Sequence, residues 1–265
     1  MSEEEKIRLG GMALGNGVLV HGPTSWACAI RLPDGTLKVA SATKRFRSSE
    51  VTNPLLRGPA RLAEVFALLP ELRRRLPEAE LPFQRPGVLA AMAGATAAVK
   101  VVRTSPNIKP AAQELVSGLL ALAPALMSLR NSDVAAYHGA EHISIGSYEH
   151  GETVEKEHER CGGHLVGPLV LTTALGNVLA AKAPLNLRGP ARLTASVGAI
   201  AASMEIFGWM VRNPRHPLAR ALGKPGHELQ HRLSTAEPTP EQLEVAEAAL
   251  AACLALETNG DGATD

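Results

Sequence analysis

Alternating apolar and polar positions near the N-terminus predict a small β element. Every second residue is apolar over residues 26–32 and again over residues 37–39, and the turn sequence Pro-Asp-Gly lies between the two runs. Period-two alternation around a turn is typical of a β-hairpin with one buried face. The Gly-rich residues 10–22 lack the spacing of a phosphate-binding loop that opens a helix. We therefore expect residues 1–50 to form a β element packed on the main domain.

From about residue 54 the apolar positions repeat every three or four residues, as they do on one face of a helix. Helical runs are expected over residues 60–76, 88–102, 110–129, 131–145, 165–183, 193–211 and 239–256. The sequence "LRGPARL" occurs at residues 56–62 and again at 187–193, each time before an apolar run. The pattern predicts a mainly α fold, a helical bundle over residues 51–256 with a small N-terminal β-hairpin element, and a disordered tail over residues 257–265.

Two of the apolar runs, 165–183 and 193–211, have about the length that a helix needs to cross a bilayer. We expect them to form an antiparallel hairpin joined at "PLNLRGPA" and to associate with a membrane. Asn177 and Lys182 interrupt the first run and Glu205 the second, so buried helices of a soluble bundle are the alternative reading.

Composition narrows the classes of function. The formal net charge is +1 and aromatic residues make up 3% of the chain, so neither a basic field nor stacking aromatics indicates a nucleic-acid partner. The three cysteines are too few and too scattered for a disulfide framework, which favours a reducing compartment. Because the runs 165–183 and 193–211 are long enough to cross a bilayer and the cysteines favour a reducing compartment, we expect a location at the cytoplasmic side of a membrane rather than a soluble cytoplasmic one.

The stretch from residue 136 to 164 holds five of the nine histidines and one of the three cysteines. Within it, His138, Glu141 and His142 fit the pattern H-x-x-E-H. On a helix this spacing places both histidines on one face, where they can bind one metal ion. In zinc peptidases with this inverted pattern, the glutamate activates a metal-bound water. Glu141 is therefore the candidate general base.

The pattern leaves the remaining ligands open. His158 and Cys161 have a spacing that can close on one ion, although the many glutamates around them would equally suit a solvated connector. Glu205 is the second candidate, because a lone carboxylate in an apolar run is costly without a metal, a cavity or a cationic partner. If Glu205 lies away from the histidines, His158 and Cys161 are left to complete the site.

Several motifs resemble the YqhQ family, the domain of unknown function 1385, whose members are described as predicted metal-dependent, membrane-associated enzymes. These motifs are "YHGAEH", the "RCG" at 160–162, "GGMALGNGVLVHGP", "ASMEI" around Glu205, and the closing "KPGHELQHRLSTAEPTPEQLEVAEAAL". The resemblance implies a multi-pass membrane protein with helical hairpins before and after "YHGAEH". The chain has Met12 and Asn16 where members usually have Gln and Glu, and Gly163 where a hydroxyl residue is usual.

Two functions are compatible with these features. The first is a metal-dependent hydrolase with a divalent ion, most simply zinc, bound by His138, His142 and either Glu205 or the pair His158 and Cys161. The alternative is a non-catalytic membrane or helical-bundle protein with a structural metal. The residues identify no substrate, and a homo-oligomer is compatible with either reading.

Overall fold

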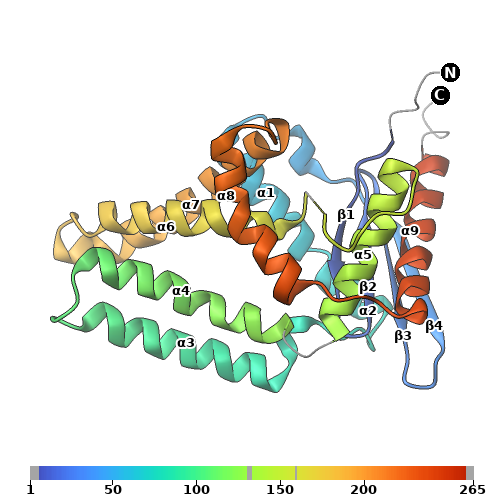
Figure 1. Ribbon diagram of the computed structural model, residues 1–265, viewed down its shortest axis with the longest axis horizontal. Helices are drawn as coiled ribbons and strands as arrows, with labels where there is room; N and C mark the ends of the chain where they lie inside the picture. The colour runs from blue at the N-terminus through green and yellow to red at the C-terminus, as the bar shows by residue number, and fades with distance from the viewer. Residues whose placement is uncertain (1–5, 130–132, 159, 261–265) are drawn as a thin grey trace.

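The structure, a computed structural model, describes residues 6–129, 133–158 and 160–260 (Figure 1). Its strands are β1 (Gly10–Ala13), β2 (Gly17–His21), β3 (Ser25–Arg31) and β4 (Leu37–Thr43). Its α-helices are α1 (Pro54–Phe66), α2 (Leu69–Arg75), α3 (Pro86–Thr104), α4 (Pro110–Leu129), α5 (Asp133–His150), α6 (Val166–Ala180), α7 (Arg188–Arg212), α8 (Pro217–Leu229) and α9 (Pro240–Gly260). The mainly α fold with an N-terminal β element is confirmed.

The β element is a four-stranded antiparallel sheet in the order β1-β2-β3-β4. It is larger than a single hairpin because the Gly-rich segment before the predicted hairpin supplies β1 and β2, which pair with Gly10 opposite His21. Alternation divides the side chains between two faces. Val18 and Val20 pack against α5 and α9, whereas Trp26 and Ile30 pack against α2 on the other face. The sheet is therefore the centre of the core.

Helix α9 is bonded to the sheet at the turn between β2 and β3. The buried Glu257 accepts hydrogen bonds from the Thr24 hydroxyl at 2.7 Å and the Ser25 hydroxyl at 2.6 Å, and from the backbone N–H of Thr24 at 2.9 Å. Residues 257–260 of the expected tail are thus part of α9, and residues 261–265 lie outside the described residues. These contacts join the two ends of the chain.

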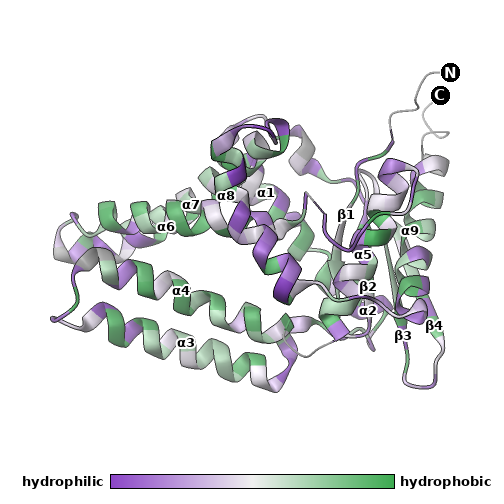
Figure 2. Cartoon of the chain, viewed as in Figure 1, coloured by the Kyte–Doolittle hydropathy of each residue, from purple (hydrophilic) through white to green (hydrophobic). Residues whose placement is uncertain are grey.

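Two helical hairpins, α3–α4 and α6–α7, extend away from the sheet, and α4 packs beside α6 (Figure 1). Four segments are long and apolar enough to cross a membrane: Pro86–Thr104, Ala112–Leu129, Gly162–Ala180 and Arg188–Arg212. Figure 2 shows that these helices consist largely of hydrophobic residues, and at most 22% of the most apolar 18-residue stretch of any of them is buried within the structure. These helices favour a membrane location. The expected α6–α7 hairpin is present, and α3–α4 is the hairpin before "YHGAEH" that the family resemblance implies.

Ion pairs centred on the buried Glu114 join the two hairpins. Glu114 on α4 is 4% exposed and bonds Arg103 of α3 at 2.8 Å and Arg192 of α7 at 3.4 Å. The two copies of "LRGPARL" both begin helices, and each uses one arginine in such a pair: Arg192 binds Glu114, and Arg57 binds Glu205. Opposite charges compensate the cost of placing a carboxylate on an apolar helix.

Candidate metal centre

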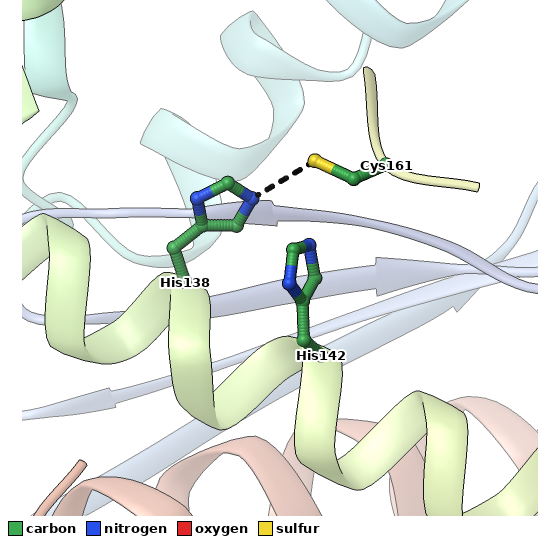
Figure 3. Close-up of side chains that lie close together, drawn as sticks. All are labelled: His138, His142 and Cys161. Carbon is green, nitrogen blue, oxygen red and sulfur yellow. Dashed lines mark hydrogen bonds between the residues drawn. The ribbon is translucent and has the colours of Figure 1, made fainter. Parts of the chain in front are cut away.

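Helix α5 positions both histidines of the H-x-x-E-H pattern. It lies against β1, β2 and α9, and most of its residues are buried. His138 and His142 project from one side of α5, and their ring centroids are 4.3 Å apart. Cys161 approaches from the following loop, and Figure 3 shows the three side chains converging. One ligand atom from each lies within 4.8 Å of the other two, so this group could hold a metal ion.

The backbone sets the tautomer of both rings. Nδ1–H of His138 donates to the carbonyl of Ser234 at 2.7 Å, and Nδ1–H of His142 donates to the carbonyl of Lys156 at 2.7 Å. A carbonyl can only accept, so the proton of each neutral ring is on Nδ1 and Nε2 keeps its lone pair. Metal-binding histidines are oriented by such a bond from the other ring nitrogen.

Cys161 is placed by a short 3₁₀ turn, Gly162–Leu165, that leads into α6. Its Sγ lies 3.4 Å from Nε2 of His138 and accepts a hydrogen bond from the N–H of Gly163 at 3.3 Å. Burial raises the pKa of the Cys161 thiol to about 12. A thiolate at this position therefore needs a cation beside it, and a metal ion supplies one.

Burial has the opposite effect on the histidines. It lowers the pKa of His142 to about 3, with His138 adding to the effect, and it also lowers the pKa of His138. Both imidazoles are therefore neutral at pH 7, which is the form that binds a metal.

Glu141, between the two histidines on α5, lies against Gly11 of β1. A Cβ atom at Gly11 of β1 would come within 2.4 Å of the Glu141 carboxylate, so only glycine leaves room for it. Burial raises the pKa of Glu141 to about 8. Among the described residues, no group donates a hydrogen bond to this carboxylate. Its charge acts on Cys161, where it contributes to the raised pKa of the thiol.

His158 lies beside the group without belonging to it. Its ring centroid is 5.6 Å from that of His142. Nε2–H of His158 donates to Glu149 at 3.1 Å, and Nδ1 accepts from the N–H of Arg160 at 3.3 Å. Both ring nitrogens are thus occupied, so the structure pairs Cys161, and not His158, with the two α5 histidines.

Glu205 is not brought to the group. It lies on α7, which packs against α6, α1 and α8, and its carboxylate forms an ion pair with Arg57 of α1. The cost of placing this carboxylate in an apolar run is therefore compensated by an arginine that is 148 residues away in the sequence. No carboxylate stands with His138, His142 and Cys161 in the described part of the chain.

Residue patterns did not reveal the groups that support the site. The carbonyls of Ser234 and Lys156 leave no signal in side-chain spacing, because any residue has a carbonyl. Gln230 is 1% exposed and accepts a hydrogen bond from the N–H of His158 at 3.0 Å. It stands in the closing motif "KPGHELQHRL", which the resemblance singled out without assigning it a role.

Comparison with known proteins identifies one family. The model for "Protein of unknown function (DUF1385)" matches residues 114–256. This region contains α5, Cys161 and the Ser234 carbonyl, so every group of the site falls inside it. No curated protein and no solved structure matches the chain.

Proposed function

The chain belongs to this family of proteins of unknown function, and we propose that it is a membrane-associated, metal-dependent hydrolase. His138, His142 and Cys161 would be the protein ligands of a divalent ion, and zinc suits a set of two imidazoles and one thiolate. The four membrane-length helices support the membrane part of the proposal.

The observation that carries the proposal is the orientation of both rings. Two separate backbone carbonyls, from Lys156 and Ser234, accept a hydrogen bond from Nδ1–H of each ring. Both Nε2 atoms thereby keep their lone pairs, and Nε2 of His138 already lies 3.4 Å from the Cys161 sulfur. Two ligands on a tetrahedral zinc ion lie about 3.4 Å apart, so small side-chain adjustments suffice from separations within 4.8 Å.

Three protein ligands favour catalysis over a structural role, because structural zinc sites use four. A bound zinc ion supplies Lewis acidity and lowers the pKa of water to about 7. Glu141 follows one helical turn after His138, and its carboxylate accepts no hydrogen bond from the described residues. We assign it the role of general base, which requires that the positive charge of the bound ion keep this buried carboxylate ionised.

Cobalt substitution tests this proposal. The purified full-length chain, stripped of metal and loaded with Co²⁺, should show the visible bands of a tetrahedral site and a near-ultraviolet sulfur-to-cobalt band. Cys161→Ser should remove the sulfur band, and His138→Ala with His142→Ala should abolish binding. Glu141→Gln should keep the metal, because Glu141 is not a ligand in this proposal.

Matched controls separate the site from general damage. Cys253→Ser removes another buried cysteine, and His231→Ala removes an exposed histidine; both variants should bind Co²⁺ normally. Added azide should shift the visible bands if a fourth position is open. Visible bands that do not shift when azide is added would contradict a hydrolase and favour the structural alternative. An absence of Co²⁺ binding would contradict both functions.

A further inference from the structure

A cleft of about 1280 Å³ lies next to the metal group. The segment before β1, the loop after α5, the end of α7 and one side of α8 line it. His158 and Gln230 are part of its lining, and these two residues also stand beside His142 and Cys161 respectively. The cleft therefore leads from the surface toward the candidate metal centre.

The cleft carries a surplus of positive charge. Its two acids are already paired: Arg160 and His158 bind Glu149, and His227 and His231 contact Glu157. Four lining cations have no acidic partner among the described residues: Lys6, which donates to the backbone carbonyl of Tyr148, and Arg8, Arg220 and Lys224. Arg220 and Lys224 are four residues apart on α8, so they present their charges on one side of that helix. A negatively charged group would balance them.

One wall of the cleft is apolar. Phe207, Met210 and Val211 line it, and all three lie near the end of α7, one of the four membrane-length helices. Apolar surface of this helix therefore runs from the membrane-length hairpin into the basic cleft. A soluble anion would use only the charges, whereas a lipid would also use this wall.

An unpaired donor marks the inner end. Gln230 is 1% exposed; its Oε1 accepts from His158, whereas its Nε2 has no hydrogen-bond partner. A Cβ atom on Gly163 would lie 3.5 Å from the Cys161 sulfur and 3.7 Å from Nε2 of Gln230, so the donor and the thiol border the same space. A buried donor without a partner is costly, and a ligand oxygen would satisfy it.

We propose that this cleft binds an anionic phospholipid. The phosphate lies between Arg220, Lys224 and the amide of Gln230, and the acyl chains lie along Phe207 and Val211. The headgroup then faces His138, His142 and Cys161. The lipid is the substrate class of the proposed hydrolase, and in that respect the inference rests on the proposed function, whereas binding itself is tested independently.

Binding of monomeric short-chain lipids tests the inference. The full-length chain in a neutral detergent should bind dihexanoyl phosphatidylglycerol at least tenfold more tightly than dihexanoyl phosphatidylcholine, measured by titration calorimetry. Glycerol 3-phosphate, which has the phosphate without the chains, should also bind at least tenfold more weakly. Equal binding of phosphatidylcholine, or of glycerol 3-phosphate, would overturn the proposal.

Variants locate the binding. Arg220→Gln with Lys224→Gln should weaken phosphatidylglycerol binding at least tenfold, and these exposed positions are not needed for folding. Arg215→Gln is the matched control, since it removes an exposed cation next to the cleft that does not line it. An equal loss of phosphatidylglycerol affinity in Arg215→Gln would show that the lipid is attracted to the basic surface in general. That result would contradict binding in this cleft.

Metal content measured in the same samples separates the two proposals. Protein that binds phosphatidylglycerol but no metal retains this inference and removes the proposed hydrolase. Protein that binds metal but does not distinguish phosphatidylglycerol from phosphatidylcholine removes this inference alone.

Discussion

Gly139 lies between the two histidines, where α5 runs closest to the segment after the π-helical turn Gln230–Ser234. The N–H of Ala236 donates to the carbonyl of Ala135 at 2.9 Å and fixes this approach. A Cβ atom on Gly139 would come within 2.2 Å of the Ala236 carbonyl oxygen. Ser234, whose carbonyl orients His138, is two residues before Ala236, so a side chain at Gly139 would disturb both the helix packing and the ring's hydrogen bond.

Gly139→Ala should therefore weaken metal binding by about 10- to 100-fold, the usual effect of losing a group that orients a metal-binding histidine. Competition with a chelator of known affinity measures this change. Gly118→Ala on α4 is the control, because nothing lies within 4 Å of a Cβ atom there. Unchanged affinity in Gly139→Ala would show that the Ser234 bond does not prepare the ring.

At the scale of elements, the pairing of α1 with α7 explains the acid that interrupts the second apolar run. Gly58 of α1 lets the helices approach, because a Cβ atom there would lie 2.8 Å from the sulfur of Met204. Beside this contact, Arg57 binds Glu205. Removing either charge leaves its partner uncompensated on a helix with an apolar surface.

We predict that Glu205→Gln lowers the unfolding temperature by a few degrees and leaves metal content unchanged. Arg57→Gln should have the same effect, since it breaks the same pair. The charge reversal Arg57→Glu with Glu205→Arg should restore part of the loss, as measured by thermal unfolding in detergent. A loss of bound metal in Glu205→Gln without a change in unfolding temperature would instead indicate that Glu205 is a metal ligand.

At the scale of the whole molecule, the hairpins and the sheet occupy opposite ends (Figure 1). A helix of 19 residues, such as Pro86–Thr104, is about 28 Å long, which matches the hydrocarbon core of a bilayer. The connections α3–α4 and α6–α7 lie together at the end away from the sheet. A membrane around the four helices would thus separate these connections from the metal group and the cleft.

Two measurements test this arrangement. The protein should stay in the membrane pellet after alkaline carbonate and high salt and be released by detergent; release by carbonate alone would contradict a spanning protein. Asp34→Cys, at the β3–β4 turn, and Asn107→Cys, between α3 and α4, should react with an impermeant maleimide from opposite sides. The described native cysteines are all buried, so they give a low background. Labelling of both positions from one side would contradict the topology.

The pattern of residues within short stretches of the sequence was enough to predict many of the elements of the fold. The alternation at Trp26 and Ile30 predicted a strand face, and both residues are fully buried against α2. The spacing of His138 and His142 predicted a shared helix face, because four residues make about one helical turn. The apolar run at 193–211 predicted a membrane-length helix. In each case the pattern that predicts the element lies within one short stretch of consecutive residues.

Only the tertiary structure decided which distant groups meet. The sequence offered Glu205, or else the pair His158 and Cys161, to complete the site, because each has a donor atom and none is tied to α5 by spacing. The sulfur of Cys161 reaches His138 through the loop after α5, whereas Glu205 meets Arg57 on a helix from the first quarter of the chain. The carbonyls that orient the rings have no side-chain signature. Periodicity records which face of an element is buried; the partner on that face depends on how the elements pack.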